Sequence, residues 1–85
     1  MRIINNHRVL EMSPYYQRRA YNELTTRDPG IAGTINTLLT RFGDAATTAA
    51  HVCENLKSMG KELGTRELEL LYNALLYIST RSQLN

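Results

Sequence analysis

Few residues in this sequence are of the types that carry catalysis, and their spacing favours structural roles. His51 is followed by Cys53 and Glu54 in a stretch with helical periodicity. Residues two apart do not share a helix face, whereas His51 and Glu54, three apart, can pair. Catalysis needs a group with a tuned pKa and a second group that orients it. A surface contact on one helix explains this pair more simply than a catalytic dyad does.

Other catalytic motifs are absent or incomplete. Glu62, Glu67 and Glu69 cluster around a predicted helix start, where the helix dipole favours negative charge. Residues 30–33 are too short for a phosphate-binding loop, and no lysine follows as that pattern requires. Neither a Gly-x-Ser-x-Gly elbow nor a His-Glu-x-x-His zinc motif occurs. We therefore expect that the protein is not an enzyme.

Metal and disulfide chemistry are equally unsupported. Cys53 is the only cysteine, which excludes an internal disulfide, and we interpret it as a small buried apolar side chain. One cysteine with two distant histidines, His7 and His51, cannot complete a four-ligand zinc site. We expect neither a metal nor a cofactor.

The apolar stretches are short. The N-terminus carries none that is long enough for a signal peptide, and no apolar run of about 18 residues occurs. The sequence therefore predicts no membrane-spanning helix and no membrane partner. A lone cysteine without an export signal fits the reducing cytoplasm, which is the location we expect.

Residues 38–44, followed by a predicted helix, have the outline of a DNA-binding helix-turn-helix with Gly43 at the turn. The helix that would read the DNA begins with residues 45–50, which include threonines but no Arg, Lys, Asn or Gln. Those four residue types make most of the common contacts to base edges and phosphates. A helix stop explains Gly43 equally well, so this motif gives DNA binding little support.

Charge is uneven along the chain, although the formal net charge is only +2. Residues 1–27 hold five arginines and two glutamates, a net +3, whereas residues 28–85 hold five basic and six acidic residues, a net −1. A basic front can attract an anionic partner, so DNA stays an alternative to a solvated arm and helix face. The DNA footprint would then be Arg2, Arg8, Arg18 and Arg19.

Helices must position these residues. Ser13 and Pro14 predict a first helix that runs to about residue 26, because serine caps helices and proline suits the first turn. Asp28 and Pro29 should cap and open a second helix. Its apolar residues recur at helical spacing and form one stripe. The stripe consists of Ile31, Ile35, Leu38, Leu39 and Phe42.

Glycines mark the later boundaries. Gly43 should end the second helix, since glycine adopts the left-handed conformation at low cost, and Asp44 can cap a third helix. Gly60 and Gly64 bracket the end of this third helix, whose front half is rich in alanine. Because the gaps between helices are short, we expect the helices to pack as neighbours.

Residues 1–12 show no helical period. Two apolar pairs, at positions 3–4 and 9–10, flank two asparagines, which allows a short hairpin or an extended arm. We interpret this segment as an N-terminal arm, flexible or docked, and residues 13–85 as a single helical domain. The predicted fold class is all-α, a small bundle of three to four short helices with an N-terminal arm.

A fourth helix, capped by Thr65 and spanning about residues 66–80, is apolar on nearly all sides. Such a helix is buried on several faces, and three short helices would cover it incompletely. An exposed apolar face marks an interaction site, so we expect a homodimer formed through this C-terminal helix. The alternative is a monomer with this helix at its centre. The residues expected at the dimer interface are Leu68, Leu71, Tyr72, Leu75, Leu76 and Ile78.

A second candidate surface lies near the front of the chain. Tyrosine and arginine are enriched at protein interfaces. Tyr15, Arg18 and Arg19, with Arg8 on the preceding arm, therefore form a candidate surface for a partner protein or DNA. Ordinary packing of an amphipathic helix is the alternative interpretation.

Residues 33–79 carry a set of spaced features that resemble a known family. These are Ile35-x-x-Leu38-Leu39, Gly43-Asp44, Val52-Cys53, Leu56-x-x-Met59 and Leu71-Tyr72-Asn73-Ala74-Leu75-Leu76. On these features the chain resembles the YmgB/AriR-like family of enterobacterial biofilm-development and two-component connectors. It departs from the family in the alanines and threonines after Gly43 and in its basic front. The resemblance implies a non-enzymatic helical protein that dimerises through its C-terminal helices and feeds a two-component phosphorelay.

The sequence supports three functional hypotheses. The first is a homodimeric regulatory adaptor, whose partner the resemblance implies is a response regulator or a sensor kinase. The second is a small DNA-binding regulator whose affinity falls steeply with salt, because phosphate contacts release counterions. The third is a phage- or plasmid-type inhibitor that occludes a host protein. The dimer predicts that Leu75→Glu separates the two copies.

Overall fold

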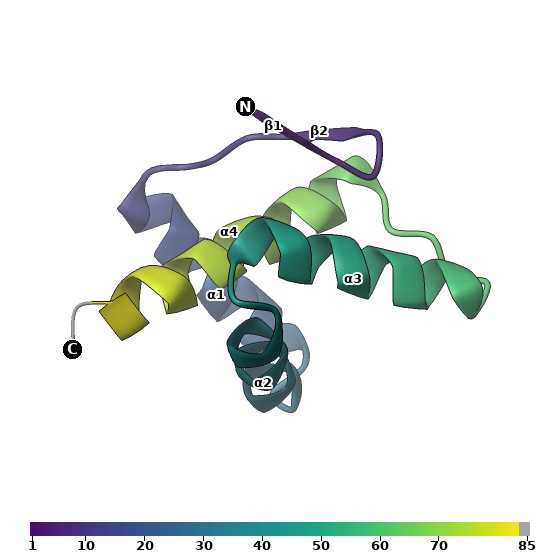
Figure 1. Cartoon of the computed structure of the whole chain (residues 1–85). Helices are drawn as coiled ribbons and strands as arrows, with labels where there is room; N and C mark the ends of the chain where they lie inside the picture. Colours follow the sequence, from purple (N-terminus) through teal and green to yellow (C-terminus); the bar gives the residue numbers. More distant parts are fainter. Residues whose placement is uncertain (84–85) are drawn as a thin grey trace.

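The C-terminal helix lies at the centre of the fold, in a computed structural model that describes residues 1–83 (Figure 1). The elements in chain order are β1 (Arg2–Ile4), β2 (His7–Val9), α1 (Pro14–Arg27), α2 (Ile31–Phe42), α3 (Ala45–Ser58) and α4 (Thr65–Gln83). Helix α4 contacts α1, α2, α3 and β2. The Cα radius of gyration of 11.8 Å agrees with the value of about 12 Å expected for a compact chain of this length.

A two-stranded antiparallel sheet forms where the sequence allowed either a hairpin or an extended arm. Ile4 pairs with His7 across a two-residue turn, and both turn residues, Asn5 and Asn6, have positive φ angles of 48° and 70°. Positive φ at both central positions matches the twist of the flanking strands, and asparagine tolerates it. The all-α prediction is corrected accordingly, since the fold is mostly helical with this small sheet added.

The hairpin is docked on the helices. Side chains alternate across a strand, so Ile3 faces solvent while Ile4 and, on β2, Val9 are buried in the core. Strand β1 contacts α3 and strand β2 contacts α4, so the hairpin lies across both helices (Figure 1). The N-terminal segment therefore contributes apolar side chains to the same core as the four helices.

The helix boundaries agree with the predicted caps at some positions only. Helix α1 begins at Pro14 as predicted. Helix α2 begins at Ile31 with Gly30 in the cap position. Asp28 instead ends α1, and its side chain accepts a hydrogen bond from the Gly30 N–H at 3.2 Å. The prediction that Asp28 and Pro29 open α2 is wrong, because the carboxylate closes a local turn of its own.

The turn between α2 and α3 confirms its predicted caps. Gly43 ends α2 with a φ of 94°. Asp44 caps α3, since its carboxylate accepts hydrogen bonds from the Thr47 N–H and the Thr47 hydroxyl, each at 2.8 Å. These bonds, the backbone one first, hold the pKa of Asp44 below its ordinary value of 3.8, because they stabilise the carboxylate.

Apolar side chains from all six elements or their flanks gather around α4. Cys53 is buried among them, as interpreted from the sequence. The buried cluster consists of Ile4, Val9, Ile35, Leu39, Ala45, Ala49, Cys53, Leu68, Leu71, Tyr72 and Leu75, with Tyr21 and Leu24 of α1 packed against it. Within residues 1–83, no helix combines the length and apolar character needed to cross a membrane.

Candidate binding surfaces

The six residues expected at a dimer interface divide into two groups on α4. Leu76 and Ile78 are half-buried. The other four belong to the core of the single chain: Leu68, Leu71, Tyr72 and Leu75. These four residues were expected at an interface because the other three helices alone would leave an apolar face of α4 uncovered. In the structure the N-terminal hairpin also packs on α4, so these four side chains are covered within one chain. The dimer itself stays a prediction.

A polar residue overlooked in the sequence fastens the N-terminal segment to α4. Asn73 is 0% exposed. Its Oδ1 accepts a hydrogen bond from the Met12 N–H, and its Nδ2 donates to the carbonyls of Leu10 and Glu69, each at 2.8 Å. A buried amide needs such partners because an unpaired one is costly. The signal in the sequence was one asparagine inside an otherwise apolar run.

Gln17 and Glu69 also bond the backbone of residues 10–12. Together with Asn73, these side chains form what we call the linker clamp. Glu69 Oε2 accepts a hydrogen bond from the Leu10 N–H at 2.8 Å, and Gln17 Nε2 donates to the Met12 carbonyl at 2.6 Å. Both ends of the short linker between β2 and α1 are therefore bonded to helices. The clamp fixes the hairpin over the first half of α4.

The linker also contacts a buried phenol. The Tyr72 hydroxyl donates to Glu11 Oε1 at 3.3 Å. Burial raises the pKa of Tyr72, and the nearby Arg2 guanidinium opposes part of that effect. The hydroxyl therefore stays protonated and acts as a donor to the linker.

The predicted partner surface on α1 is exposed. Tyr15 and Tyr16 are 64% and 52% exposed, and their rings meet edge to face with centroids 5.1 Å apart. Arg18 and Arg19 follow one turn later and are also exposed. We call these four residues the aromatic–arginine face.

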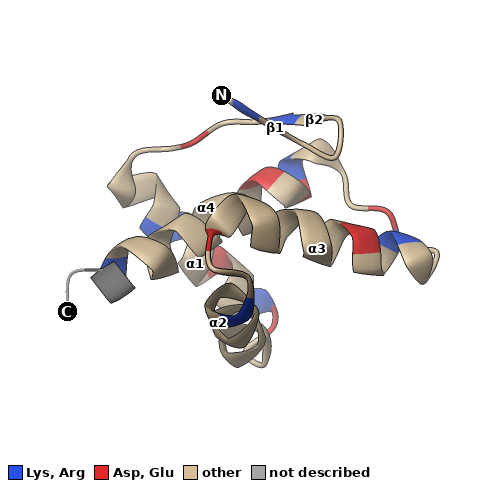
Figure 2. Cartoon of the chain, in the orientation of Figure 1, with Lys and Arg blue, Asp and Glu red and all other residues tan. Residues whose placement is uncertain are grey.

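Arg8 lies apart from this face. It is exposed on β2, and α1 contacts neither strand. Figure 2 shows blue segments on the hairpin as well as on the helices, so the basic front of the sequence is divided between separate elements. The structure thus brings together Tyr15, Arg18 and Arg19 but not Arg8.

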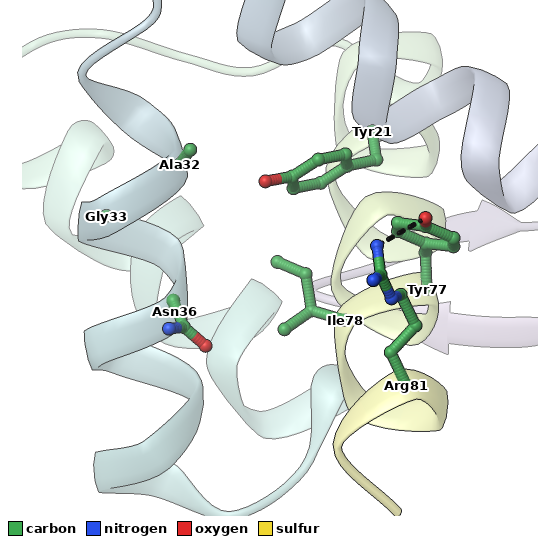
Figure 3. Close-up of a pocket in the computed structure, with 7 residues that line it drawn as sticks. All are labelled: Tyr21, Ala32, Gly33, Asn36, Tyr77, Ile78 and Arg81. Atoms are coloured by element: carbon green, nitrogen blue, oxygen red, sulfur yellow. Dashed lines mark hydrogen bonds between the residues drawn. The ribbon is translucent and has the colours of Figure 1, made fainter. Parts of the chain in front are cut away.

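A groove of about 360 Å³ lies between α1, α2 and the second half of α4. Figure 3 shows Tyr21 and Ile78 reaching from α1 and α4 toward α2, where the facing residues are small. The Tyr21 and Tyr77 rings lie with centroids 5.2 Å apart. The described residues that line the groove are Tyr21, Ala32, Gly33, Asn36, Tyr77, Ile78 and Arg81.

Arg81 stands at one end of this groove. Its Nη1 donates a hydrogen bond to the Tyr77 hydroxyl at 2.9 Å, drawn as a dashed line in Figure 3. Its guanidinium carbon lies 5.4 Å from the Tyr77 ring centroid, a distance at which the ring face attracts a cation. The groove therefore combines aromatic walls with a positioned positive charge, a feature that the sequence pattern did not indicate.

Four of the residues considered for catalysis or metal binding line one surface pocket, namely His7, Cys53, Glu54 and Glu62, and His51 lies outside it. The His51 ring stacks on Phe42, with centroids 4.0 Å apart and planes inclined by 7°. His7 lies on β2, where its Nδ1 is 2.7 Å from the Thr65 hydroxyl oxygen. Glu67 accepts a hydrogen bond from the Gly64 N–H at 3.2 Å, next to the start of α4. Among the residues that the structure describes, no group of three or more His, Cys, Asp or Glu side chains could hold a metal ion.

The helix-turn-helix outline corresponds to α2, Gly43 and α3. At the front of α3, which would enter the DNA groove, Ala45, Thr48 and Ala49 are buried in the protein and Thr47 is exposed. Thr47 is engaged by Asp44 through the cap described above. A reading helix must present its front to the bases, so this packing disfavours α3 in that role.

Comparison with known proteins returned no match: no protein-family model, curated protein or solved structure is significantly similar to the chain. The resemblance to the connector family therefore stays a prediction.

Proposed function

We propose that this chain is a small, non-enzymatic regulatory adaptor that acts by binding a protein partner through the aromatic–arginine face of α1. The observation that supports the proposal is the exposure of two touching tyrosine rings beside two exposed arginines. Tyrosine and arginine dominate the binding energy of many protein interfaces. Four such side chains on the first turns of one helix form a surface suited to a protein partner.

The identity of the partner is proposed from the resemblance. A response regulator or a sensor kinase of a two-component pathway is the partner class to test first, with an effect on biofilm or stress regulation. Self-association is part of the same proposal. Of the two half-buried residues in the predicted set, Leu76 can contribute to a contact between two copies, whereas Ile78 lines the groove between α1, α2 and α4. Light scattering over a range of concentrations measures self-association.

The experiment is affinity capture from a lysate of the source cells, with and without nuclease, followed by mass spectrometry. The variant Tyr15→Ser/Arg18→Ser removes one ring and one cation from the face. Met59→Ser/Lys61→Ser is the matched control, because Met59 and Lys61 are also an exposed apolar residue and an exposed cation, located beyond α3. Circular dichroism establishes that both variants are folded.

We expect one protein to be captured by the wild type and the control, to survive nuclease, and to be lost with the face variant. Capture that is unchanged in the face variant would contradict this use of α1. Recovery of nucleic acid, with bound proteins lost on digestion, would instead support a DNA-binding regulator and direct mutagenesis to Arg18 and Arg19.

A further inference from the structure

The groove between α1, α2 and α4 combines apolar walls with one positive charge and no negative charge among its described lining residues. Its floor and walls are apolar, formed by Ile78, by the small residues Ala32 and Gly33, and by the rings of Tyr21 and Tyr77. Its polar groups are an arginine, an asparagine and two phenols, and none of the described lining residues is acidic. Hydrogen-bond donors without an acidic neighbour are complementary to an anion.

Arg81 supplies the charge in a form available to a ligand. A guanidinium has five N–H donors, and the hydrogen bond to the Tyr77 hydroxyl uses one of them. The one ion pair found within residues 1–83 joins Arg27 and Glu23, so no described carboxylate neutralises Arg81. Because the Tyr77 ring and hydroxyl hold the guanidinium, its remaining donors are already oriented when a ligand arrives.

Gly33 leaves space across the groove from that charge (Figure 3). A Cβ placed on Gly33 would meet nothing within 4 Å, and Ala32 next to it is also small. At about 360 Å³, the groove is near the lower limit of ligand pockets. This space suits one large apolar side chain with an adjacent carboxylate. Nucleic acid is disfavoured, because phosphate binding relies on several cations and this groove has one.

We propose that the groove binds an acidic peptide segment of a protein partner, in which an aspartate or glutamate is adjacent to a large apolar residue. The apolar side chain occupies the space over Gly33 between Tyr21 and Ile78, and the carboxylate pairs with Arg81. This inference rests on the proposed function, because it specifies the chemistry of a partner segment. It adds a second contact surface, separate from the aromatic–arginine face.

The test uses two peptides that differ only in charge, acetyl-Phe-Glu-amide and acetyl-Phe-Gln-amide, titrated into the isotope-labelled full chain and followed by NMR. We expect shifts centred on the amides of Gly33, Asn36 and Ile78. The Glu peptide should bind about five- to tenfold more tightly than the Gln peptide, since hydrogen bonds to an ionised group are the stronger ones.

Three variants locate the site. Arg81→Gln should remove the preference for the Glu peptide while leaving weak binding of both peptides. Gly33→Leu should fill the groove and abolish binding, with its fold established from the remaining spectrum. Arg41→Gln is the matched control and should bind like the wild type, because Arg41 also lies near an aromatic ring, that of Phe42 at 5.7 Å, but does not line this groove.

Equal affinity for the two peptides, or shifts centred elsewhere, would overturn the proposal. Tighter binding of acetyl-Gln-Phe with a free C-terminal carboxylate would mean that the groove recognises a chain terminus and not an acidic side chain. Shifts at the groove that depend on protein concentration, without any peptide, would mean that a second copy of the chain occupies it. Either result would overturn the assignment. Failure of peptide binding, while the partner is still captured through α1, refutes this inference and leaves the proposed function intact. Peptide binding at the groove without any partner captured from the lysate would refute the proposed use of α1 and leave the peptide site intact.

Discussion

Leu75 and Leu76 are neighbours on α4, yet Leu75 is fully buried and Leu76 is half-buried. Tyr72 and Tyr77 differ in the same way. The first half of α4 is covered by the hairpin and the linker clamp. In the second half, Leu76 borders a hollow beside Arg2, Glu11 and the front of α3, and Tyr77 borders the groove opposite the small residues of α2. The two halves are similar in residue type, so hydrophobicity alone does not decide which one is sealed.

The difference shows how a short chain closes its core. The first half is sealed because a distant segment carries apolar side chains to it and polar backbone groups that Asn73 and Glu69 can bond. The second half receives no such segment within the described residues, and it keeps a tyrosine- and arginine-lined hollow. Binding capacity is therefore expected in the second half and stability in the first.

The largest expected effect separates a sealed position of α4 from an open one by the same substitution at adjacent residues. Leu75→Glu places a carboxylate in the core, where an unpaired charge costs several kcal/mol, out of a total stability of about 5 to 15 kcal/mol for a small domain. We expect Leu75→Glu to unfold the chain rather than separate a dimer, and Leu76→Glu to remain folded because its carboxylate can reach solvent. Circular dichroism and light scattering measure both. A folded, monomeric Leu75→Glu protein derived from a dimeric wild type would restore the interface interpretation.

A smaller effect is expected when the clamp is broken. Asn73→Leu leaves the Met12 N–H and the Leu10 carbonyl without their side-chain partner. The cost should lie below the upper value of about 3 kcal/mol for a buried unpaired group, because both hydrogen bonds are only partly buried. Hydrogen exchange at the Met12 amide should accelerate relative to the wild type. Asn55→Leu, on the exposed side of α3, is the control and should leave the Met12 amide unchanged. Unaltered protection in Asn73→Leu would show that the apolar contacts of the hairpin suffice to dock the linker.

The helix cap at Asp44 lies outside α4, and its removal should have a smaller effect on stability. Asp44→Ala removes the cap of α3 and should cost about 1 kcal/mol near neutral pH. Because the pKa of Asp44 is lowered from 3.8 in the folded state, the wild type keeps this contribution above that value and loses it as the pH falls through the lower, folded-state pKa. Urea unfolding should therefore give a difference between wild type and variant that shrinks at strongly acidic pH. A constant difference would contradict the ionic part of the cap.

The smallest expected effect is a gain in stability at Gly33, which lines the groove. Gly33→Ala should stabilise α2 by up to about 1 kcal/mol, because alanine has the higher helix propensity and its Cβ has free space. Gly43→Ala should destabilise the chain, since Gly43 has a φ of 94° that alanine adopts poorly. Thermal melting measures both variants. A lower melting temperature in Gly33→Ala would mean that the groove floor is less open than the structure indicates.

Local signals predicted most of the helical framework. The stripe of residues 31–42, the stop at Gly43 and the cap at Asp44 depend on interactions within a few residues, so they were readable in sequence. The start of α2 was misplaced because Asp28 had two local options, a helix cap and a turn, and the observed one is the turn. The candidate site was predicted in part, since the exposed face of one helix places Tyr15, Arg18 and Arg19 together without long-range information.

The sequence by itself determined which segments become helices and which face of each is apolar, because periodicity and capping are local properties. Only the tertiary structure decided which apolar face is covered. That outcome depends on Asn73 meeting the backbone of residues 10 and 12, more than sixty positions earlier, and on small residues of α2 facing Tyr21, Ile78 and Arg81. Contacts between segments so far apart in the chain produce no periodic pattern in the amino-acid sequence, so the sequence alone does not predict them. The tertiary structure therefore placed four of the six residues expected at an interface in the core and formed a groove that the sequence did not indicate.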